Sequence, residues 1–359
     1  PDPVGPAGRV DIMNTRSLYY TAPLKCAVRD EALPAIGPEQ LLVAARCSAI
    51  SAGTEMLVFT GRIPVGLPVD ATLPSYAGQR FAYPLAYGYS SVGKVVAAGA
   101  QVHPGWIGQR VFAFRPHQSH YLALADELIR LPPDLPDEDA VFLASMETAV
   151  NLVMDGRPLL GEQVMLLGQG VIGLLTTALL AHYPLGALVA LERWPARRQA
   201  ARDLGAGAVW SGAEPDFDRK AAAAFERSDA DGRADLVFEL SGRPSMLDTA
   251  IAWAGFGARI VVGSWYGTKA ATIDLGGRFH RQRIRLVASQ VSTIDPIHSA
   301  RWTARRRLDT ALAMLARVQP SRLITHRFAI DDAQWALEQI ADRPQETLQV
   351  LLTYGAAPD

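Results

Sequence analysis

The chain has 359 residues, 49% of them hydrophobic, and its 35 basic and 36 acidic residues leave a formal net charge of −1. This length and apolar content predict two domains with separate cores. The charge argues against an electrostatic nucleic-acid binder, and no apolar run is long enough to span a membrane. Cys26 and Cys47 are the only cysteines, which excludes a disulfide scaffold and a four-cysteine zinc lobe and favours the cytoplasm.

The first part of the chain is predicted to be rich in short strands with closely spaced turns. A Pro/Gly-rich leader precedes Met13 and is left out of the expected fold. Residues 61–84 are rich in Pro, Gly and aromatic residues and are predicted to form a long loop, a feature that is usually functional or disordered. The expected strands are 17–20, 25–29, 40–46, 87–96, 105–112 and 122–125.

The rest of the chain alternates between strand and helix patterns. A helical pattern runs from Asp137 to Leu152, and strands and helices alternate from about 160 to 290. After Pro296 the chain returns to a short β/α segment. Its expected elements are a helix over 305–317, a strand over 328–330, a helix over 333–341 capped by Asp331, and a strand over 349–353.

A glycine turn between a strand and a helix is the strongest functional signal. The strand 164–167 is followed by G-x-G-x-x-G and by an apolar helix over 174–182, which is the context of a dinucleotide-binding turn. The first glycine allows a tight turn, the second lets a pyrophosphate approach, and the third lets helix and strand pack closely. The residues expected to hold the cofactor here are Gly168, Gln169, Gly170, Val171, Ile172 and Gly173.

Three further strands end in residues suited to a ligand. They cover 187–191, 235–240 and 259–262, and they predict an α/β fold with a doubly wound parallel Rossmann sheet, in which ligands bind at the carboxyl ends of the strands. The further cofactor-binding candidates are Glu192, Arg193, Ser241, Gly263 and Ser264.

The choice of cofactor depends on two opposing charges. A carboxylate at Glu192 would accept the ribose hydroxyls of NAD and repel a 2′-phosphate. Arg193, Arg197 and Arg198 could instead bind the 2′-phosphate of NADP, although the last two also fit solvated helix positions. The prediction is NAD, with NADP as the alternative.

The chain from Met13 onward resembles the medium-chain dehydrogenase/reductase superfamily. The matching segments are Ala49-Ile-Ser51, Gly53-Thr-Glu55, Gly88 to Val95, Glu147-Thr-Ala149 and Ala196 to Ala206. The resemblance implies a β-rich GroES-like catalytic domain from 13–150 and 296–359, and a dinucleotide-binding Rossmann domain from 151–295. It also implies a homodimer or a dimer of dimers, in which an edge strand pairs across a twofold axis, with 258–262 and 284–289 apolar enough to supply the end of that sheet.

Departures from the family pattern imply a zinc-independent member. Ser51 and Tyr89 stand at the first two positions of the family's catalytic zinc site, and Ala144 or a neighbour stands at the third. These side chains make no tetrahedral zinc site. The Ser-Ala-Gly-Thr-Glu segment and the segment around Tyr89 are similar to the subgroup around the bacteriochlorophyllide hydroxyethyl dehydrogenases.

Four residues are candidates for catalysis. By the resemblance, Thr54 is a hydroxyl proton relay and Glu55 its supporting acid, but Thr54 could also cap a helical turn. Tyr89 is a proton donor or the wall of an aromatic pocket. Glu147 is an active-site acid or a helix-start acid that complements the helix dipole.

Two histidines, His117 and His120, have metal-like spacing but no acidic or cysteine partner nearby in sequence. Polar packing in a loop is therefore the favoured interpretation, with proton shuttling as the alternative.

The expected function is hydride transfer between a nicotinamide and a substrate alcohol or carbonyl, in secondary or biosynthetic metabolism. Reduction of a C=C bond, as in enoyl or quinone reductases, and dinucleotide binding without turnover remain alternatives. The aromatic residues between Phe59 and Tyr89 suggest a flat or apolar small-molecule substrate, although ordinary loop packing explains them equally well.

Overall fold

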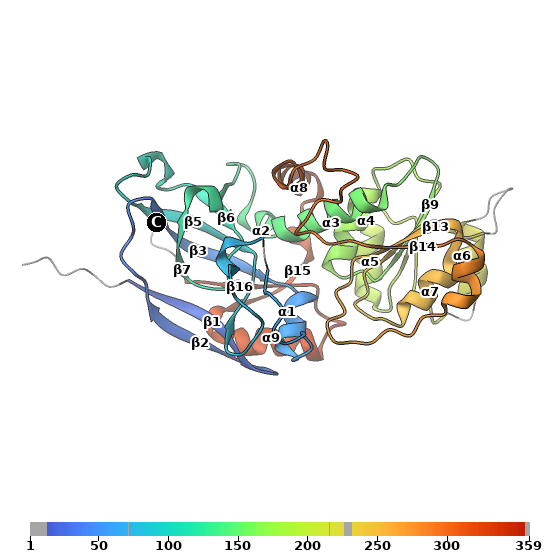
Figure 1. Ribbon diagram of the computed structural model, residues 1–359, viewed down its shortest axis with the longest axis horizontal. Coiled ribbons are helices and arrows are strands. Elements are labelled where there is room, and N and C mark those ends of the chain that lie inside the picture. Colours follow the sequence, from blue (N-terminus) through green and yellow to red (C-terminus); the bar gives the residue numbers. More distant parts are fainter. Residues whose placement is uncertain (1–12, 71, 215, 226–231, 356–359) are drawn as a thin grey trace, which may run out of the picture.

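The computed structural model describes residues 13–70, 72–214, 216–225 and 232–355, so the Pro/Gly-rich leader lies outside the described residues. The molecule is elongated, with antiparallel strands at one end and a parallel sheet at the other (Figure 1). The long helices α3 (Leu143–Gly156) and α8 (Ala304–Val318) lie between the two ends. No helix of the described chain is long and apolar enough to cross a membrane.

The parallel sheet has the strand order β11-β10-β9-β12-β13-β14. This order reverses between β9 and β12 and is that of a doubly wound dinucleotide fold, so the predicted Rossmann sheet is confirmed. Its helices are α4 (Val171–Leu180), α5 (Pro195–Asp203), α6 (Phe217–Ala224) and α7 (Met246–Trp253). Its strands are β9 (Gln163–Leu167), β10 (Ala187–Leu191), β11 (Ala208–Trp210), β12 (Ala234–Glu239), β13 (Ala254–Val262) and β14 (Arg285–Ala288).

The strand-rich part contains a seven-stranded and a three-stranded sheet. The larger has the order β15-β16-β3-β5-β6-β8, with β7 on β3, and the smaller has the order β2-β1-β4. The strands are β1 (Asn14–Ala22), β2 (Lys25–Ala32), β3 (Gln40–Ile50), β4 (Leu85–Ala86), β5 (Ser91–Ala98), β6 (Arg110–Ala113), β7 (His120–Leu124), β8 (Ile129–Arg130), β15 (Ile324–Ala329) and β16 (Gln349–Thr353). The helices are α1 (Thr54–Phe59), α2 (Asp137–Ala140) and α9 (Ala333–Asp342).

Most predicted elements are present, with some corrected bounds. The helical pattern from Asp137 is two helices, and β11 was not predicted. Ile330 belongs to a 3₁₀ turn rather than to a strand, and α9 begins after Asp332, whose side chain makes no capping bond. The predicted cap Asp331 is therefore wrong, because its carboxylate pairs instead with Arg16 on β1.

One apolar core contains residues of both parts of the molecule. It contains Phe112 of β6, Met146 of α3, Leu166 of β9 and Leu315 of α8, all of them fully buried. The helix α3 packs on α4, α8 and the parallel strands β12 and β13, and its buried residues share this core with Val92 of β5 and Phe112 of β6 in the strand-rich part. The space left between the two parts is where a ligand can enter.

Candidate active site

The glycine turn joins β9 to α4 at the edge of this space. Gly168 has φ +96°, and a Cβ there would lie 2.7 Å from the Cα of Ser241, so no larger residue fits. A Cβ on Gly173 would lie 2.1 Å from the carbonyl oxygen of Gly168. At Gly170 the only heavy atom of the described residues that a Cβ would meet within 4 Å is a guanidinium nitrogen of Arg197, at 3.9 Å. The middle glycine thus faces open space, as a pyrophosphate seat requires.

Glu192 follows β10 and is buried beside this turn. Its Oε2 accepts the backbone N–H of Gln169 at 2.8 Å, and its Oε1 accepts the N–H of Trp194 at 2.9 Å. A carboxylate has about four acceptor positions, so two bonds leave capacity for ribose hydroxyls. Gln169 itself is fully buried, and its side chain bonds to Thr177 rather than facing a ligand.

A cavity of about 1970 Å³ lies between the strand-rich part and the Rossmann sheet. This is larger than the roughly 300–1,000 Å³ that a drug-sized ligand occupies, and it fits a dinucleotide together with a substrate. The predicted cofactor residues that line it are Gly168, Gly170, Val171, Ile172, Gly173, Glu192, Arg193, Ser241, Gly263 and Ser264. Of the catalytic candidates, Thr54, Tyr89 and Glu147 line it, and Glu55 does not.

Three hydroxyl side chains that line the cavity, those of Ser51, Thr54 and Tyr89, lie close together. Thr54 is the first residue of α1, and its backbone N–H donates to the Oγ of Ser51 at 3.3 Å. Tyr89 reaches the same place from the segment before β5. Burial and the charge of Glu55 raise the pKa of Tyr89 to about 12, while hydrogen bonds with the Ser51 and Thr54 side chains lower it. Since the Thr54 side chain makes no capping bond, the proposed helix-cap role is wrong.

Glu55 lies behind these hydroxyls and is fully buried. Its Oε2 is 2.7 Å from Nε2 of His117 and accepts the hydroxyl of Tyr20 at 2.8 Å, and its Oε1 accepts the backbone N–H of Ser51 at 2.8 Å. The other ring nitrogen of His117 lies 2.7 Å from Oγ of Ser48. Glu55 therefore holds the segment that carries Ser51 and Thr54 and does not touch the cavity.

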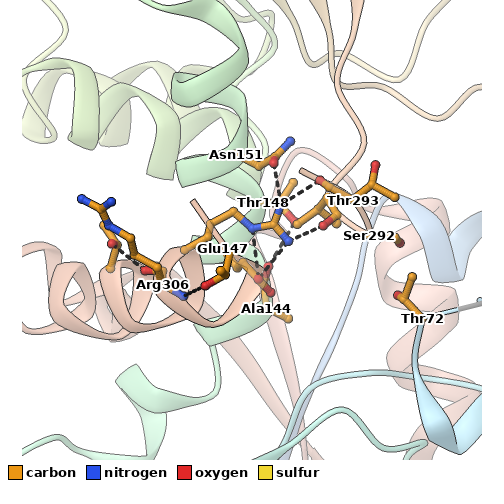
Figure 2. A network of polar contacts seen from close by, with 12 residues as sticks. Thr72, Ala144, Glu147, Thr148, Asn151, Ser292, Thr293 and Arg306 are labelled. Atoms are coloured by element: carbon orange, nitrogen blue, oxygen red, sulfur yellow. Dashed lines mark hydrogen bonds and ion pairs between the residues drawn. The ribbon is translucent and has the colours of Figure 1, made fainter. Parts of the chain in front are cut away.

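Glu147 does not open a helix as predicted, because α3 begins at Leu143. Its Oε1 accepts Nε and Nη2 of Arg307 on α8, both at 3.1 Å (Figure 2). Arg307 also donates to Oδ1 of Asn151 at 2.6 Å and to the backbone carbonyls of Thr293 and Val291. Burial raises the pKa of Glu147, and the Arg307 charge opposes that shift. The helix-start interpretation is wrong, and the carboxylate instead anchors the cavity-lining segment 291–293.

The residues at the expected zinc position do not fit that metal. Ser51 and Tyr89 offer hydroxyls, and Ala144 offers no donor, whereas protein zinc sites use thiolate, imidazole and carboxylate ligands. The imidazole of His117 belongs to this network, but Glu55 and Ser48 occupy both of its ring nitrogens. Among the described residues no group of three or more His, Cys, Asp or Glu side chains could hold a metal ion. His120 bonds to Ser119, which agrees with polar packing.

Aromatic rings form one wall of the cavity. Tyr76, Tyr87 and Tyr89 line it, with ring centroids 5.5 Å apart between Tyr76 and Tyr87 and 6.0 Å apart between Tyr87 and Tyr89. Trp265, from the segment after β13, packs on Phe81 at 5.9 Å. The predicted long loop thus contributes Tyr76 to the aromatic wall of the cavity, and the Rossmann part contributes Trp265.

Sequence reasoning missed the partners of several of these residues. His117 has an acidic partner in Glu55, although the two lie far apart in sequence. Arg307 and Trp265 were not singled out as residues lining the cavity. The only local signal was the aromatic content of 61–84, because the remaining contacts depend on how the sheets and helices pack.

Comparisons with known proteins agree with this geometry, although no protein-family model matches the chain. The chain is 27% identical to the (R,R)-butanediol dehydrogenase of Bacillus subtilis, over 56% of the chain and 64% of that protein. It is 25% identical to the 2-desacetyl-2-hydroxyethyl bacteriochlorophyllide A dehydrogenase of Rhodobacter capsulatus, over 96% of the chain and 100% of that protein. A dehydrogenase of Escherichia coli solved with NADH has the same fold, with a TM-score of 0.75, 17% identity, and coverage of 95% of this chain and 99% of that chain.

Proposed function

We propose that this chain interconverts an alcohol and a carbonyl compound without a catalytic zinc ion. Its fold and its relatives are those of NAD(P)-dependent dehydrogenases of the medium-chain type. The observation that carries the proposal is the single cavity that joins the glycine turn to the hydroxyls of Ser51, Thr54 and Tyr89. We further propose that the Rossmann domain covers 151–295 and that residues 13–150 and 296–359 form the GroES-like catalytic domain. The proposed location is the cytoplasm, where the two free cysteines would stay reduced.

A nicotinamide cofactor held by the glycine turn and Glu192 would supply or accept a hydride when it is bound in the cavity. Hydride addition to a carbonyl carbon leaves negative charge on the oxygen, and donors must stabilise that charge where it develops. Tyr89 has a pKa of about 12 and therefore keeps its proton at neutral pH, so its phenol can donate to the substrate oxygen. Thr54 is the second donor, and Glu55 holds the segment that carries it by accepting the backbone N–H of Ser51.

The aromatic wall favours a substrate with a flat or apolar body. Tyr76, Tyr87 and Trp265 line the cavity, and aromatic side chains bury a large apolar area. The relatives that act on alcohols make a carbonyl or alcohol the first choice for the reacting group. Titration with NADH, followed by a search among aromatic ketones and aldehydes for oxidation of the bound cofactor, tests the proposal. Saturable NADH binding without turnover of any carbonyl or enone would instead favour a non-catalytic dinucleotide-binding protein.

Metal analysis is expected to find no stoichiometric zinc in protein purified without chelators. The reason is that Ser51, Tyr89 and Ala144 supply no thiolate or imidazole, and both nitrogens of His117 are already bonded. The measurement is elemental analysis before and after dialysis, together with activity with and without a chelator. One equivalent of zinc that survives dialysis would contradict this prediction.

The protein is expected to bind NADH more tightly than NADPH, by roughly tenfold or more, because the buried Glu192 carboxylate would repel a 2′-phosphate. Fluorescence titrations of both cofactors on the wild type and on Glu192→Gln measure the preference. Glu192→Gln removes the charge but keeps an acceptor for the backbone N–H groups, and Glu192→Ala removes both. Tighter NADPH binding by the wild type would show that Arg193 and its neighbours dominate.

We also expect a homodimer, formed through β14. This strand is the edge of the parallel sheet and pairs only with β13 among the described strands, and Leu286 on it is 37% exposed. An unpaired edge readily adds a second strand, and a twofold axis would pair β14 with its own copy. Light scattering should give twice the chain mass of 38.7 kDa, and Leu286→Lys should lower it. A wild-type monomer at micromolar concentration would refute the idea.

A further inference from the structure

Two positively charged side chains line the cavity where the strand-rich part meets the segment after β13. Arg62 follows α1 in the strand-rich part, and Lys269 follows β13 in the Rossmann part. The backbone N–H of Thr268 donates to the carbonyl oxygen of Arg62 at 3.0 Å, and a Cβ on Gly267 would lie 2.2 Å from that oxygen. The two segments are therefore in direct contact, at a position that only glycine allows.

The ammonium group of Lys269 is held in place by a hydrogen bond. Its Nζ donates to the backbone carbonyl of Gly242 at 2.6 Å, which uses one of its three N–H donors. On the same segment, the hydroxyl of Tyr266 donates to the buried carboxylate of Glu239. Two N–H groups of Lys269 therefore remain for an acceptor in the cavity, on a segment that these contacts fix.

Neither cation has an ion-pair partner among the described residues, including the described acidic residues that line the cavity. Partial burial lowers the pKa of Lys269, the charge of Arg62 lowers it further, and the charge of Glu239 opposes both. The two oxygens of Glu239 already accept hydrogen bonds from Ser241 and Tyr266. Since neighbouring like charges disfavour each other, an anion that reaches both cations would be stabilised here.

These cations lie near one end of α1, and Thr54 lies at the other end. The backbone N–H of Arg62 donates to the carbonyl oxygen of Leu57, so Arg62 turns back against the end of the helix. Because α1 has six residues, its ends lie about 9 Å apart. Trp265, which adds to the aromatic wall, comes from the same segment as Lys269. A flat substrate of this length can therefore reach from Thr54 to Arg62 and Lys269.

We propose that Arg62 and Lys269 bind an anionic group of the substrate, a carboxylate or a phosphate, roughly 10 Å from the carbon that exchanges the hydride. The inference deepens the proposed function and rests on it. A planar guanidinium and a compact ammonium group both donate strong hydrogen bonds to such oxygens. The substrate class is thus a flat carbonyl compound, or its alcohol, that carries a negative charge at the opposite end. A phosphate of the cofactor is the competing ligand.

Matched probes that bind to the NADH complex test this charge. The probes are para-substituted biphenyl carboxamides, whose far ring carries a carboxylate, a phosphate or, as the neutral reference, a methyl ester. The carboxamide supplies a carbonyl oxygen that the nicotinamide does not reduce, so calorimetry measures binding alone. We expect the carboxylate or the phosphate to bind about 10- to 100-fold more tightly than the ester, and the stronger of the two identifies the anion.

Substitution of the cations should remove this preference. Lys269→Met and Arg62→Met should each abolish most of the difference between the anionic probes and the ester, whereas Lys269→Arg keeps a charge and should retain part of it. The matched control is Lys94→Met on β5, which removes a positive charge that does not line the cavity and should retain the full preference.

NADH titrations show whether the cations bind the cofactor instead. If NADH binding by Lys269→Met and Arg62→Met falls as much as binding of the anionic probes, the cations hold the cofactor and the inference is overturned. Equal affinity of the wild-type NADH complex for all three probes, or binding of none, would also overturn it, while oxidation of bound NADH by neutral aromatic aldehydes would leave the proposed function in place. Failure of the wild type to bind NADH would overturn both.

Discussion

Tyr89→Phe and Thr54→Val are each expected to lower turnover by about 10²–10⁴-fold, the usual cost of losing a positioned proton donor. Both substitutions remove a hydroxyl with little change of volume. NADH binding should remain, since neither side chain belongs to the glycine turn. The matched control is Tyr19→Phe. It removes a phenol hydroxyl that donates to Glu31 on the three-stranded sheet, and it should leave turnover unchanged.

The pH dependence of kcat/KM shows whether Tyr89 acts as a protonated phenol or as a tyrosinate. Because burial and the nearby Glu55 charge raise the pKa of Tyr89 to about 12, the phenol stays protonated throughout the neutral range. The profile of kcat/KM for carbonyl reduction should therefore show no step from Tyr89 below about pH 11. The prediction is contradicted if both single variants and the double variant keep near-wild-type turnover while chemistry is rate-limiting. Another group would then have to donate the proton.

Glu55→Ala is expected to lower the free energy of unfolding by about 3–5 kcal/mol, because three buried polar groups lose their acceptor and each unsatisfied group costs about 1–3 kcal/mol. The substitution leaves His117, the Tyr20 hydroxyl and the Ser51 backbone N–H without their acceptor inside the protein. Urea unfolding monitored for the strand-rich part measures the loss. Glu31→Ala is the control, because it removes a carboxylate that accepts the Tyr19 hydroxyl near the surface and should cost about 1 kcal/mol or less.

A double variant tests whether the cost comes from stranded polar groups. Glu55→Met with His117→Leu replaces both members of the pair by apolar side chains, and its loss should be smaller than the sum of the two single losses. Additive losses, or a neutral Glu55→Ala, would contradict the buried network as a source of stability.

Features that depend on a few consecutive residues could be predicted from the sequence. The turn from Gly168 to Gly173 and the position of Glu192 follow from a strand, three glycines and a helix in direct succession, so the sequence reveals them. The bounds of β10 and β16 follow in the same way from short apolar runs between turn residues.

Contacts between distant segments could not be predicted from such patterns. Glu147 was expected at a helix start, but its partner Arg307 comes from another helix far along the chain. His117 lacked a neighbour in sequence, and the fold supplies Glu55. Arg197 could be read as a ligand of a 2′-phosphate or as solvated surface, and only the structure shows its bonds to Pro344 and Thr347. Each of these pairings requires that the two parts of the molecule are already assembled.

The pairing of β16 with β3 has a consequence for how the protein is made. β3 is an interior strand of the seven-stranded sheet, and Ile50 pairs with Val350 near the end of the described chain. Chains fold from the N-terminal side while they leave the ribosome. The six strands of the parallel sheet are all synthesised before β16, so that sheet can close first. During this interval residues 47–50 of β3 lack their partner strand β16, and an unpaired edge is prone to join a strand of another chain. The final strand therefore ends the period in which the nascent protein is most exposed to aggregation.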